Sequence, residues 1–337
     1  MFAVIPGTDV REALEGREKA VVAIVEDAYR VHGVGSTVNP PSYFLRFPDR
    51  PDARIIALPA SLRGPADGVD GLKWISSFPG NIASGLPRAS AVLVLNDPAN
   101  GYPYACLESS VISAARTAAS AALAADVLSA DRGRPRTVGF LGTGLIARFV
   151  HQYLAGTDWS FDEVNVHDLV PEYASGFTGY LERRNTDKRI TVRESPEDVI
   201  RNSELVVFAT TAAEPHITDP SWFDHHPLVL HVSLRDLSPE VIAASFNIVD
   251  DVEHCLKADT SVHLLEKRVR NRYFIAGTLF DVLTHVVTVP AEETVVFSPF
   301  GLGVLDLAVG KHVYDETKRA GRLRTVDGFF AELCRHG

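Results

Sequence analysis

The amino-acid sequence predicts an α/β protein of about two domains, one of them a doubly wound parallel sheet. The chain has 337 residues, and a domain commonly holds roughly 150. From Thr137 onward, short apolar runs alternate with helical patterns, which is typical of a parallel sheet built from strand–helix units. The segment before Thr137 carries closely spaced prolines and short strands instead. A basic stretch, Asp131–Arg136, separates the two patterns and is interpreted as a linker.

Composition and charge limit the classes of function. Hydrophobic residues make up 46% and charged residues 23% of the chain, as in an ordinary soluble protein. The net charge of −10 argues against a nucleic-acid partner. The N-terminus has no basic segment or long apolar run, and Val111–Leu128 is interrupted by Arg116 and Asp126, so we expect no signal peptide and no membrane span. The cysteines are too scattered for a disulfide framework, which favours a reducing cytoplasm. They are Cys106, Cys255 and Cys334.

The first domain is predicted to hold a mixed, largely antiparallel sheet with two long helices. Apolar residues recur at helical spacing over Arg17–His32. Prolines between Val34 and Leu62 exclude long helices there and favour short strands. A run of alanine and serine predicts a second helix over Glu108–Ala130. The expected strands are Tyr43–Phe47, Arg54–Leu58, Gly71–Ser76 and Ala91–Asn96.

The second domain is predicted to alternate strands and helices, and a later helix follows it. The expected strands are Thr137–Leu141, Glu163–His167, Arg189–Arg193, Leu205–Thr210 and Leu228–Ser233. The expected helices are Leu145–Ala155, Glu172–Arg184 and Pro196–Asn202, the last capped by Ser195. Gly303–Lys318 is amphipathic and far from the glycine turn, and we expect it to return to the first domain.

A glycine-rich turn is the strongest local signal. Gly142-Thr143-Gly144-Leu145-Ile146-Ala147 follows a predicted strand and opens a predicted helix, as a dinucleotide-binding turn requires. Gly142 permits the tight turn, Gly144 lets the backbone approach a pyrophosphate, and Ala147 lets the helix pack closely. Asp168 ends the next strand, 26 residues after Gly142, where a carboxylate binds ribose hydroxyls and repels a 2′-phosphate. The pattern therefore predicts NAD rather than NADP, against the alternative of an ordinary turn with a chance aspartate.

Two cations lie in apolar surroundings. Lys73 belongs to a largely apolar strand, and Arg116 lies in the middle of the alanine-rich helix. Such cations need an anionic partner or water. A structural ion pair or a side chain that reaches solvent is one interpretation. The other is that Arg116 holds a substrate carboxylate in a bidentate fork.

Three further groups of polar residues are candidates for chemistry or metal binding. Asp236 follows an apolar strand of the predicted parallel sheet, where ligands bind beyond the strand ends; the alternative is a helix cap before Pro239. Adjacent histidines on a strand or loop point apart, and no further ligand has a recognisable spacing, so no metal site is expected. The candidate histidines are His225, His226 and His231, of which the first two are adjacent. Cys106 has no evident base partner and is expected to be a buried structural thiol.

Several of these motifs occur together in one known family. Lys73 with Phe78-Pro79-Gly80-Asn81, then Arg116-Thr117-Ala118-Ala119, then Gly142-Thr143-Gly144 resemble the ornithine cyclodeaminase/mu-crystallin family, from about residue 9 to about residue 325. Other stretches resemble one branch of it, the N-((2S)-2-amino-2-carboxyethyl)-L-glutamate dehydrogenases, which make L-2,3-diaminopropionate for siderophores and peptide antibiotics. These stretches are Arg54-Ile55-Ile56-Ala57-Leu58-Pro59, Arg88-Ala89-Ser90, Leu95-Asn96-Asp97-Pro98 with Tyr102-Pro103, and Glu108-Ser109-Ser110-Val111-Ile112-Ser113.

The resemblance implies a discontinuous architecture and assigns roles to residues. Residues 1–132 with 303–337 would form a substrate-binding and dimerisation domain, and residues 133–302 an inserted Rossmann domain that binds NAD. The implied substrate-binding residues are Arg46, Lys73 and Arg116, and the implied catalytic residues are Asp236 and Lys73. The cofactor would contact Gly142, Thr143, Gly144, Leu145, Ile146, Asp168, Thr210, Ser233 and Gly301, the last near the nicotinamide. A homodimer is the expected assembly.

One departure from the family pattern bears on the reaction. Cyclodeaminases carry a glutamate in the strand that here reads Ile55-Ile56-Ala57-Leu58-Pro59, and an Asp-Ser-Val-Gly type sequence where Ser298-Pro299-Phe300-Gly301 stands here. The resemblance therefore implies an NAD-dependent dehydrogenase that cleaves N-((2S)-2-amino-2-carboxyethyl)-L-glutamate, an amino-acid derivative with several carboxylates, to L-2,3-diaminopropionate and 2-oxoglutarate. The alternatives are a lyase that converts ornithine to proline and ammonia, a non-catalytic nucleotide-binding protein of the crystallin type, and an alanine- or imine-reducing relative.

Overall fold

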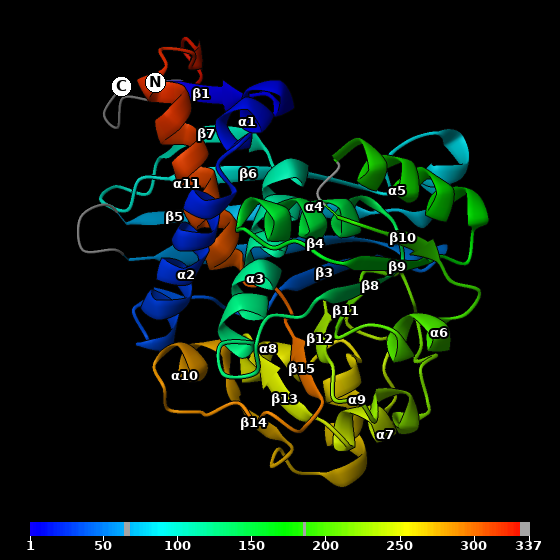
Figure 1. The fold of residues 1–337 in the computed structure, drawn as a ribbon. Coiled ribbons are helices and arrows are strands. Elements are labelled where there is room, and N and C mark those ends of the chain that lie inside the picture. The colour runs from blue at the N-terminus through cyan, green and yellow to red at the C-terminus, as the bar shows by residue number, and fades with distance from the viewer. Residues whose placement is uncertain (64–67, 185–186, 331–337) are drawn as a thin grey trace. The chain divides into compact units, whose positions relative to one another are not determined.

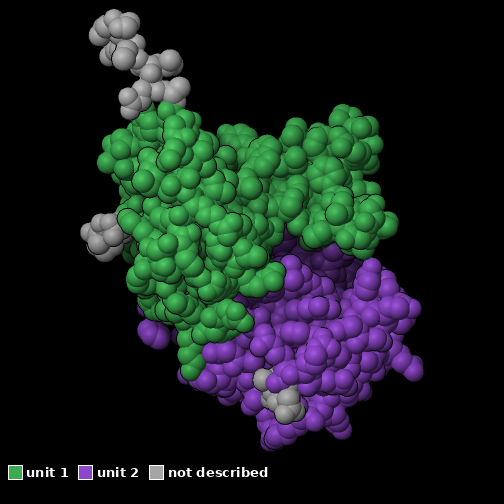
Figure 2. Space-filling view, turned by 90° about the horizontal axis from the view of Figure 1, so that it is seen from above, with its two compact units in different colours: residues 1–116, 302–337 green, residues 117–301 purple. Residues whose placement is uncertain are grey.

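The chain folds into two compact units. The computed structural model describes residues 1–63, 68–184 and 187–330. Unit 1 comprises Met1–Arg116 and Leu302–Gly337, and unit 2 comprises Thr117–Gly301 (Figure 2). The boundaries at 132/133 and 302/303 that the sequence suggested for the functional domains stay a prediction.

Unit 1 is built on a mixed sheet of eight strands. The strands are β1 (Phe2–Ile5), β2 (Thr37–Val38), β3 (Tyr43–Phe47), β4 (Arg50–Leu62), β5 (Val69–Ser77), β6 (Ala89–Asn96), β7 (Pro103–Glu108) and β16 (Arg324–Val326). They lie in the order β16-β1-β7-β6-β5-β4-β2, with β3 also paired to β4. All neighbours are antiparallel except β1 and β7, which are parallel.

Helices cover this sheet on one face. They are α1 (Gly7–Leu14), α2 (Glu18–Gly33), the start of α3 (Ser110–Leu128) and α11 (Gly303–Arg319), with a short 3-10 turn, η1, at Pro79–Ser84. α11 packs against α2 and against strands β4 and β5, so the C-terminal helix belongs to the same unit as the N-terminal segment (Figure 1).

Strand β4 is longer than the sequence predicts, because two prolines are tolerated in it. The predicted strand Arg54–Leu58 extends at both ends and includes Pro51 and Pro59. β3 pairs with β4 as far as Ala57, and β2 pairs only from Ser61. On that side β4 has no partner at Pro59, where a residue without an N–H is accommodated.

Unit 2 contains a sheet of eight parallel strands. They are β8 (Thr137–Leu141), β9 (Glu163–His167), β10 (Ile190–Val192), β11 (Leu205–Phe208), β12 (Leu228–His231), β13 (Phe246–Val249), β14 (Ile275–Thr278) and β15 (Val295–Ser298). The order is β10-β9-β8-β11-β12-β15-β13-β14, and every neighbouring pair is parallel. The order reverses between β8 and β11, and ligands of such sheets bind at this switch point, beyond the carboxyl ends of the strands. The predicted doubly wound fold is confirmed.

Helices pack on both faces of the parallel sheet. They are α4 (Leu145–Gly156), α5 (Pro171–Arg184), α6 (Pro196–Arg201), α7 (Pro239–Ala243), α8 (Val252–Cys255), α9 (Ser261–Val269) and α10 (Leu279–Leu283), with a 3-10 turn, η2, at Pro220–Phe223. On one face Phe140 of β8 contacts Phe177 of α5, with ring centroids 5.2 Å apart. On the other, Val199 of α6, Val241 of α7 and Leu265 of α9 share one buried cluster with the strands.

The alanine-rich helix α3 has the length and apolar composition of a membrane span, but 67% of its apolar window is buried inside the structure. The core helix of a water-soluble protein has the same properties. Cys106 and Cys255 are free thiols, and Cys334 lies outside the described residues.

Candidate functional site

The turn after β8 has the conformation that its glycines permit. Gly142 has a φ of 81°, which side chains disfavour. A Cβ at this position would lie 2.7 Å from the carbonyl oxygen of Ala209. The Gly142 N–H donates to the carbonyl of His167, 3.1 Å away. The turn is therefore pinned between the ends of β9 and β11, and residue 142 must be glycine.

Gly144 provides open space instead of a tight turn. A Cβ there would have no neighbour within 4 Å, although the residue lies at the N-cap of α4. The N-cap residue is glycine and has no side chain to cap the helix, so the first N–H groups are left for a ligand. Leu145 and Ile146 form the first turn, and Leu145 is exposed. Open space beside a 12-residue helix N-terminus fits the pyrophosphate of a dinucleotide.

Asp168 ties the second strand to this turn. One carboxylate oxygen accepts hydrogen bonds from the N–H and the hydroxyl of Thr143, both at 2.8 Å, and the other accepts from the N–H of Val170 at 3.0 Å. Thr143 is buried, whereas Asp168 is half-buried at the carboxyl end of β9. The carboxylate thus keeps an accessible edge at the place where NAD-binding sheets receive the ribose.

Asp236, after β12, lies at the centre of a buried hydrogen-bond network. The hydroxyls of Thr210 and Ser233 donate to its two carboxylate oxygens. His216 Nε2 lies 3.0 Å from Oδ1, and His231 Nε2 lies 3.3 Å from Oδ2. Burial by itself would raise the pKa of Asp236, but the hydrogen bonds from His216, His231 and Ser233 outweigh it and hold the pKa well below its usual range.

Gly301 is held by a carboxylate that the sequence analysis missed. Asp250 accepts hydrogen bonds from the backbone N–H groups of Phe300, at 2.9 Å, and Gly301, at 2.7 Å. Gly301 has a φ of 93°. Burial raises the pKa of Asp250 above its usual value, although these two N–H groups oppose the shift. The loop after β15 is therefore fixed from β13, whose last residue directly precedes Asp250.

The residues of unit 2 assigned to cofactor and chemistry all follow parallel strands. Gly142–Gly144 follow β8, Asp168 follows β9, Thr210 follows β11, and Asp236 with Ser233 follows β12. Gly301 follows β15 in the same way. Because parallel strands end at one edge of a sheet, these residues gather at the edge where ligands bind.

Lys73 and Arg116 meet in unit 1 at a third residue, Asp306 of α11. Lys73 Nζ lies 2.6 Å from Asp306 Oδ2, and Arg116 Nε lies 3.1 Å from Oδ1. Asp306 is completely buried, and Lys73 and Arg116 are only 2% and 11% exposed. Burial, followed by the charge of Arg116, lowers the pKa of Lys73 to about 8, while Asp306 opposes the shift. Both cations therefore form the ion pair that was one of the two interpretations of the sequence. Two positive charges against one negative charge leave the cluster with a net positive charge.

Arg46 does not join that cluster. It is exposed on β3, and its guanidinium lies 5.1 Å from the ring centroid of Phe44. Arg46 is paired with Arg54 of β4, which is paired with Ser77 of β5. Ser77 is four residues from Lys73 on the same strand, so these positions lie on the same face of the sheet as Lys73. Arg88, which the sequence analysis did not place at the site, donates to the Ser77 hydroxyl at 2.8 Å.

Two of the three histidines considered above have hydrogen-bond partners in the structure. His225 Nε2 contacts the Ser203 carbonyl, and His231 belongs to the Asp236 network. In residues 1–63, 68–184 and 187–330, no group of three or more potential ligands is arranged to hold a metal ion. Cys106 is half-buried rather than buried, and burial raises the pKa of its thiol, which disfavours the nucleophilic thiolate.

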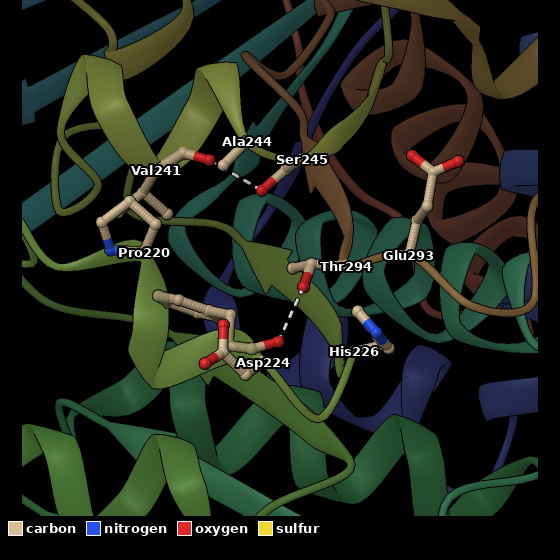
Figure 3. Close-up of a pocket in the computed structure, with 9 residues that line it drawn as sticks. Pro220, Asp224, His226, Val241, Ala244, Ser245, Glu293 and Thr294 are labelled. Atoms are coloured by element: carbon tan, nitrogen blue, oxygen red, sulfur yellow. Dashed lines mark hydrogen bonds between the residues drawn. The ribbon is translucent and has the colours of Figure 1, made fainter.

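A cavity of about 150 Å³ lies elsewhere in unit 2 (Figure 3). Asp224 and His226 line it just before β12, and Glu293 and Thr294 line it just before β15. It therefore lies at the amino ends of the strands, opposite the edge that carries the glycine turn. It includes none of the residues assigned to the cofactor or to chemistry.

Comparison with known proteins shows similarity across almost the whole chain. Alanine dehydrogenase of Archaeoglobus fulgidus is 28% identical over 90% of this chain and 92% of its own. N-((2S)-2-amino-2-carboxyethyl)-L-glutamate dehydrogenase of Staphylococcus aureus is 27% identical over 93% of this chain and 94% of its own. A solved archaeal alanine dehydrogenase dimer with bound NAD superposes with a TM-score of 0.86 at 25% identity, covering 97% of this chain and 99% of that one.

The family resemblance is confirmed by a profile match that spans residues 7–321. With the parallel sheet, the glycine turn and these relatives, the match leaves one assignment: the chain belongs to the ornithine cyclodeaminase/mu-crystallin family.

Proposed function

We propose that the protein cleaves N-((2S)-2-amino-2-carboxyethyl)-L-glutamate oxidatively to L-2,3-diaminopropionate and 2-oxoglutarate, with NAD⁺ as the electron acceptor. The prediction of an NAD-dependent oxidoreductase that acts on the CH–NH group of an amino acid derivative is confirmed by the relatives. The specific substrate, and the use of the product as a siderophore or peptide-antibiotic precursor, are our proposal. The cationic face of the unit 1 sheet carries it.

That face is suited to a substrate with several carboxylates. Lys73 and Arg116 are two cations against the single carboxylate of Asp306, so the buried cluster attracts one further anion. Arg116 uses only Nε on Asp306, which leaves its terminal nitrogens for a carboxylate fork.

Further along the same face, Arg46 and Arg54 are register partners. Like charges directly opposite each other repel, and an anion between them relieves that repulsion. Arg88 adds a third cation beside Ser77, and burial lowers the pKa of its guanidinium. The proposed substrate carries three carboxylates, whereas ornithine carries one.

The residues after β8 and β9 fit NAD. The first turn of α4, with the open space at Gly144, would hold the pyrophosphate. Asp168 would bind the ribose hydroxyls and repel a 2′-phosphate. When bound, NAD⁺ supplies a hydride acceptor. Thr210, Ser233 and Gly301, at the ends of β11, β12 and β15, are proposed to position the nicotinamide half.

The reaction needs proton transfer both before and after the hydride leaves. The secondary amine of the substrate is protonated near neutral pH and first releases one proton to the solvent, because only the neutral nitrogen has the lone pair that the next step uses. Loss of the hydride from the glutamate α-carbon lets the nitrogen lone pair form a C=N bond, giving a protonated imine. Water adds to the carbon, and collapse of the carbinolamine breaks the C–N bond with the electron pair on nitrogen. Both protons of the water end on the departing amine. The Asp236 network is proposed to handle these protons, and Lys73 to hold a carboxylate of the substrate.

We also propose a cytoplasmic homodimer that forms through the uncovered face of the unit 1 sheet. Val92, Trp74, Ala57 and Tyr43 form one row across four strands. Val92, Trp74 and Tyr43 are 41–70% exposed, and Val4 and Leu45 add to the same apolar face. Apolar faces of this kind mark interaction surfaces. The relative solved with NAD is itself a dimer.

The electron balance tests the proposed reaction. The purified protein is given NAD⁺ and N-((2S)-2-amino-2-carboxyethyl)-L-glutamate, with ornithine in parallel. We expect NADH, 2-oxoglutarate and diaminopropionate to appear one to one to one. A cyclodeaminase returns the hydride to its cyclic imine, so proline and ammonia from ornithine without NADH would replace the proposal with the lyase.

A further inference from the structure

We propose that His216 is the group that accepts and returns the proton in this reaction, and that Asp236 is the positioning residue that orients it. The inference rests on the proposed function for the identity of the substrate. The geometry of the His216–Asp236 pair is independent of the proposed function. His216 was not among the residues that the sequence motifs pointed to.

Asp236 is poorly placed to act as the base itself. Its side chain is completely buried, and both carboxylate oxygens accept hydrogen bonds, Oδ1 from Thr210 and His216 and Oδ2 from Ser233. The backbone N–H of Asp236 in turn donates to His231 Nε2 at 3.1 Å. A carboxylate that accepts this many hydrogen bonds is stabilised as the anion and has little affinity for another proton. A useful base needs such affinity near the working pH.

His216 has the access that Asp236 lacks. Its side chain is 40% exposed, while Nε2 lies 3.0 Å from Asp236 Oδ1. Within the part of the chain that the structure describes, the other ring nitrogen, Nδ1, has no hydrogen-bond partner. With Nε2–H donating to the carboxylate, Nδ1 carries the free lone pair. Asp236 then stabilises the imidazolium that forms, as the carboxylate does in other carboxylate–histidine pairs.

The backbone holds the two residues together as well. The N–H groups of His216 and Ile217 both donate to the carbonyl of Asp236, at 3.0 and 2.9 Å. The N–H of Ser238 donates back to the Ile217 carbonyl at 2.9 Å. These hydrogen bonds connect the loop after β11 to the loop after β12. A histidine in a loop that is fixed by these three backbone bonds, one of them its own, is preorganised for its task.

The other titratable neighbours do not offer a competing base. His231 is completely buried, and its two ring nitrogens contact Asp236 and Ser298. Glu214 lies in the same loop as His216, but no hydrogen bond joins it to Asp236 among the described residues. His216 therefore combines accessibility, a free nitrogen and an anionic partner.

One such group accounts for the protons that move after hydride transfer from the neutral amine. As water attacks the protonated imine, the C–O bond forms, the C=N π pair returns to nitrogen, and one water proton passes to His216 Nδ1. The imidazolium then protonates the nitrogen as the C–N bond breaks. The second water proton leaves the hydroxyl as the carbonyl forms and reaches the amine by the same route, so His216 ends in its starting state.

Three variants test the assignment by turnover. His216→Gln keeps an amide donor near the Asp236 carboxylate but cannot carry a proton, and we expect kcat to fall about 10²- to 10⁴-fold with NADH affinity within threefold of wild type. His216→Ala should lose turnover similarly and regain part of it with free imidazole. His225→Ala, in which an exposed histidine that contacts only a carbonyl is removed, should keep wild-type turnover and ignore imidazole.

A second readout does not depend on turnover. Diethyl pyrocarbonate labels exposed histidines, and peptide mapping follows His216 and His225 separately. NADH with 2-oxoglutarate should shield His216 and leave His225 reactive. If the wild type does not oxidise the amine but NADH with 2-oxoglutarate shields His216, the proposed substrate is wrong and the placement of His216 at the site is retained. Unshielded His216, His216→Gln turnover within threefold of wild type, or His216→Ala that imidazole does not rescue would each overturn the inference.

Discussion

Lys73 Nζ lies 2.6 Å from Oδ2 of Asp306, a residue 233 positions away in the sequence, and both side chains are buried. Arg116 reaches the other oxygen of the same carboxylate. One anion therefore organises both cations that we assign to substrate carboxylates. Without it, two positive charges would face each other in a buried site, which costs free energy.

We expect Asp306→Asn to destabilise the protein strongly. Breaking a buried ion pair by removing one partner typically costs about 3–5 kcal/mol, and here two cations lose their anion. The free energy of unfolding in urea measures the effect. Asp315→Asn is the matched control on the same helix, because Asp315 forms a partly exposed pair with Lys311 and should cost under about 1 kcal/mol. A loss at Asp306 no larger than that at Asp315 would show that the buried pair is not required for folding.

The pKa of Lys73 predicts a change in substrate binding with pH. Burial and Arg116 lower the pKa to about 8, so above that pH the amine becomes neutral and attracts a carboxylate less. We expect kcat/KM, which reports the free enzyme, to fall above about pH 8 in the wild type. Lys73→Arg keeps its charge at all these pH values, so the fall should disappear even if the variant is slower. Lys311→Arg is the control and should keep the wild-type fall in kcat/KM. If the fall persists in Lys73→Arg, a group other than Lys73 causes it.

Cofactor preference should follow Asp168. We expect NAD⁺ to be preferred over NADP⁺ by at least tenfold in kcat/KM, or about 1.4 kcal/mol. Asp168→Ser should narrow that ratio, because the repulsion of the 2′-phosphate is removed. Since Asp168 also holds Thr143, Thr143→Val is the control: it removes the hydroxyl bond and leaves the charge, so the ratio should stay. Equal use of both cofactors by the wild type would contradict the assignment.

Five of the eight parallel strands were predicted, and the central ones are recognisable because they are buried on both faces. The strands β13, β14 and β15 were not predicted. β8 and β9 have the predicted bounds, Thr137–Leu141 and Glu163–His167, since continuous apolar runs between turn residues mark such strands. β7 was missed, because it begins at Pro103 and ends at Glu108 and lacks that pattern. β16, at the edge of the other sheet, and its neighbour β1 were missed because they are only three and four residues long.

The residues of the site likewise divide into those that a local sequence pattern predicts and those that it does not. The glycine turn and Asp168 are close enough in sequence to form a motif, whereas partners brought together only by the tertiary fold leave no local pattern. In the sequence, Asp306 resembles an ordinary polar position of α11, and the residues next to it in the chain do not indicate that its partner is Lys73. His216 lies in a loop whose docking onto Asp236 depends on two adjacent parallel strands. Buried polar residues in amphipathic helices were the available signal for Asp306, since an unpaired buried charge is costly.

The two glycines of the turn after β8 should fail in different ways when each is replaced by alanine. At Gly142 the φ is 81° and a Cβ would lie 2.7 Å from a backbone oxygen, so Gly142→Ala strains the fold and should lower the free energy of unfolding. At Gly144 the φ is −73° and a Cβ meets nothing within 4 Å. Gly144→Ala should therefore fold with nearly wild-type stability and lose affinity for NADH, because the methyl group occupies the space proposed for the pyrophosphate. We expect at least a tenfold rise in Kd, or about 1.4 kcal/mol, by NADH fluorescence titration. Gly179→Ala in α5 is the control, since its Cβ would approach only the mobile end of Arg183. An NADH Kd for Gly144→Ala within twofold of the Gly179→Ala value would move the pyrophosphate away from this helix N-terminus.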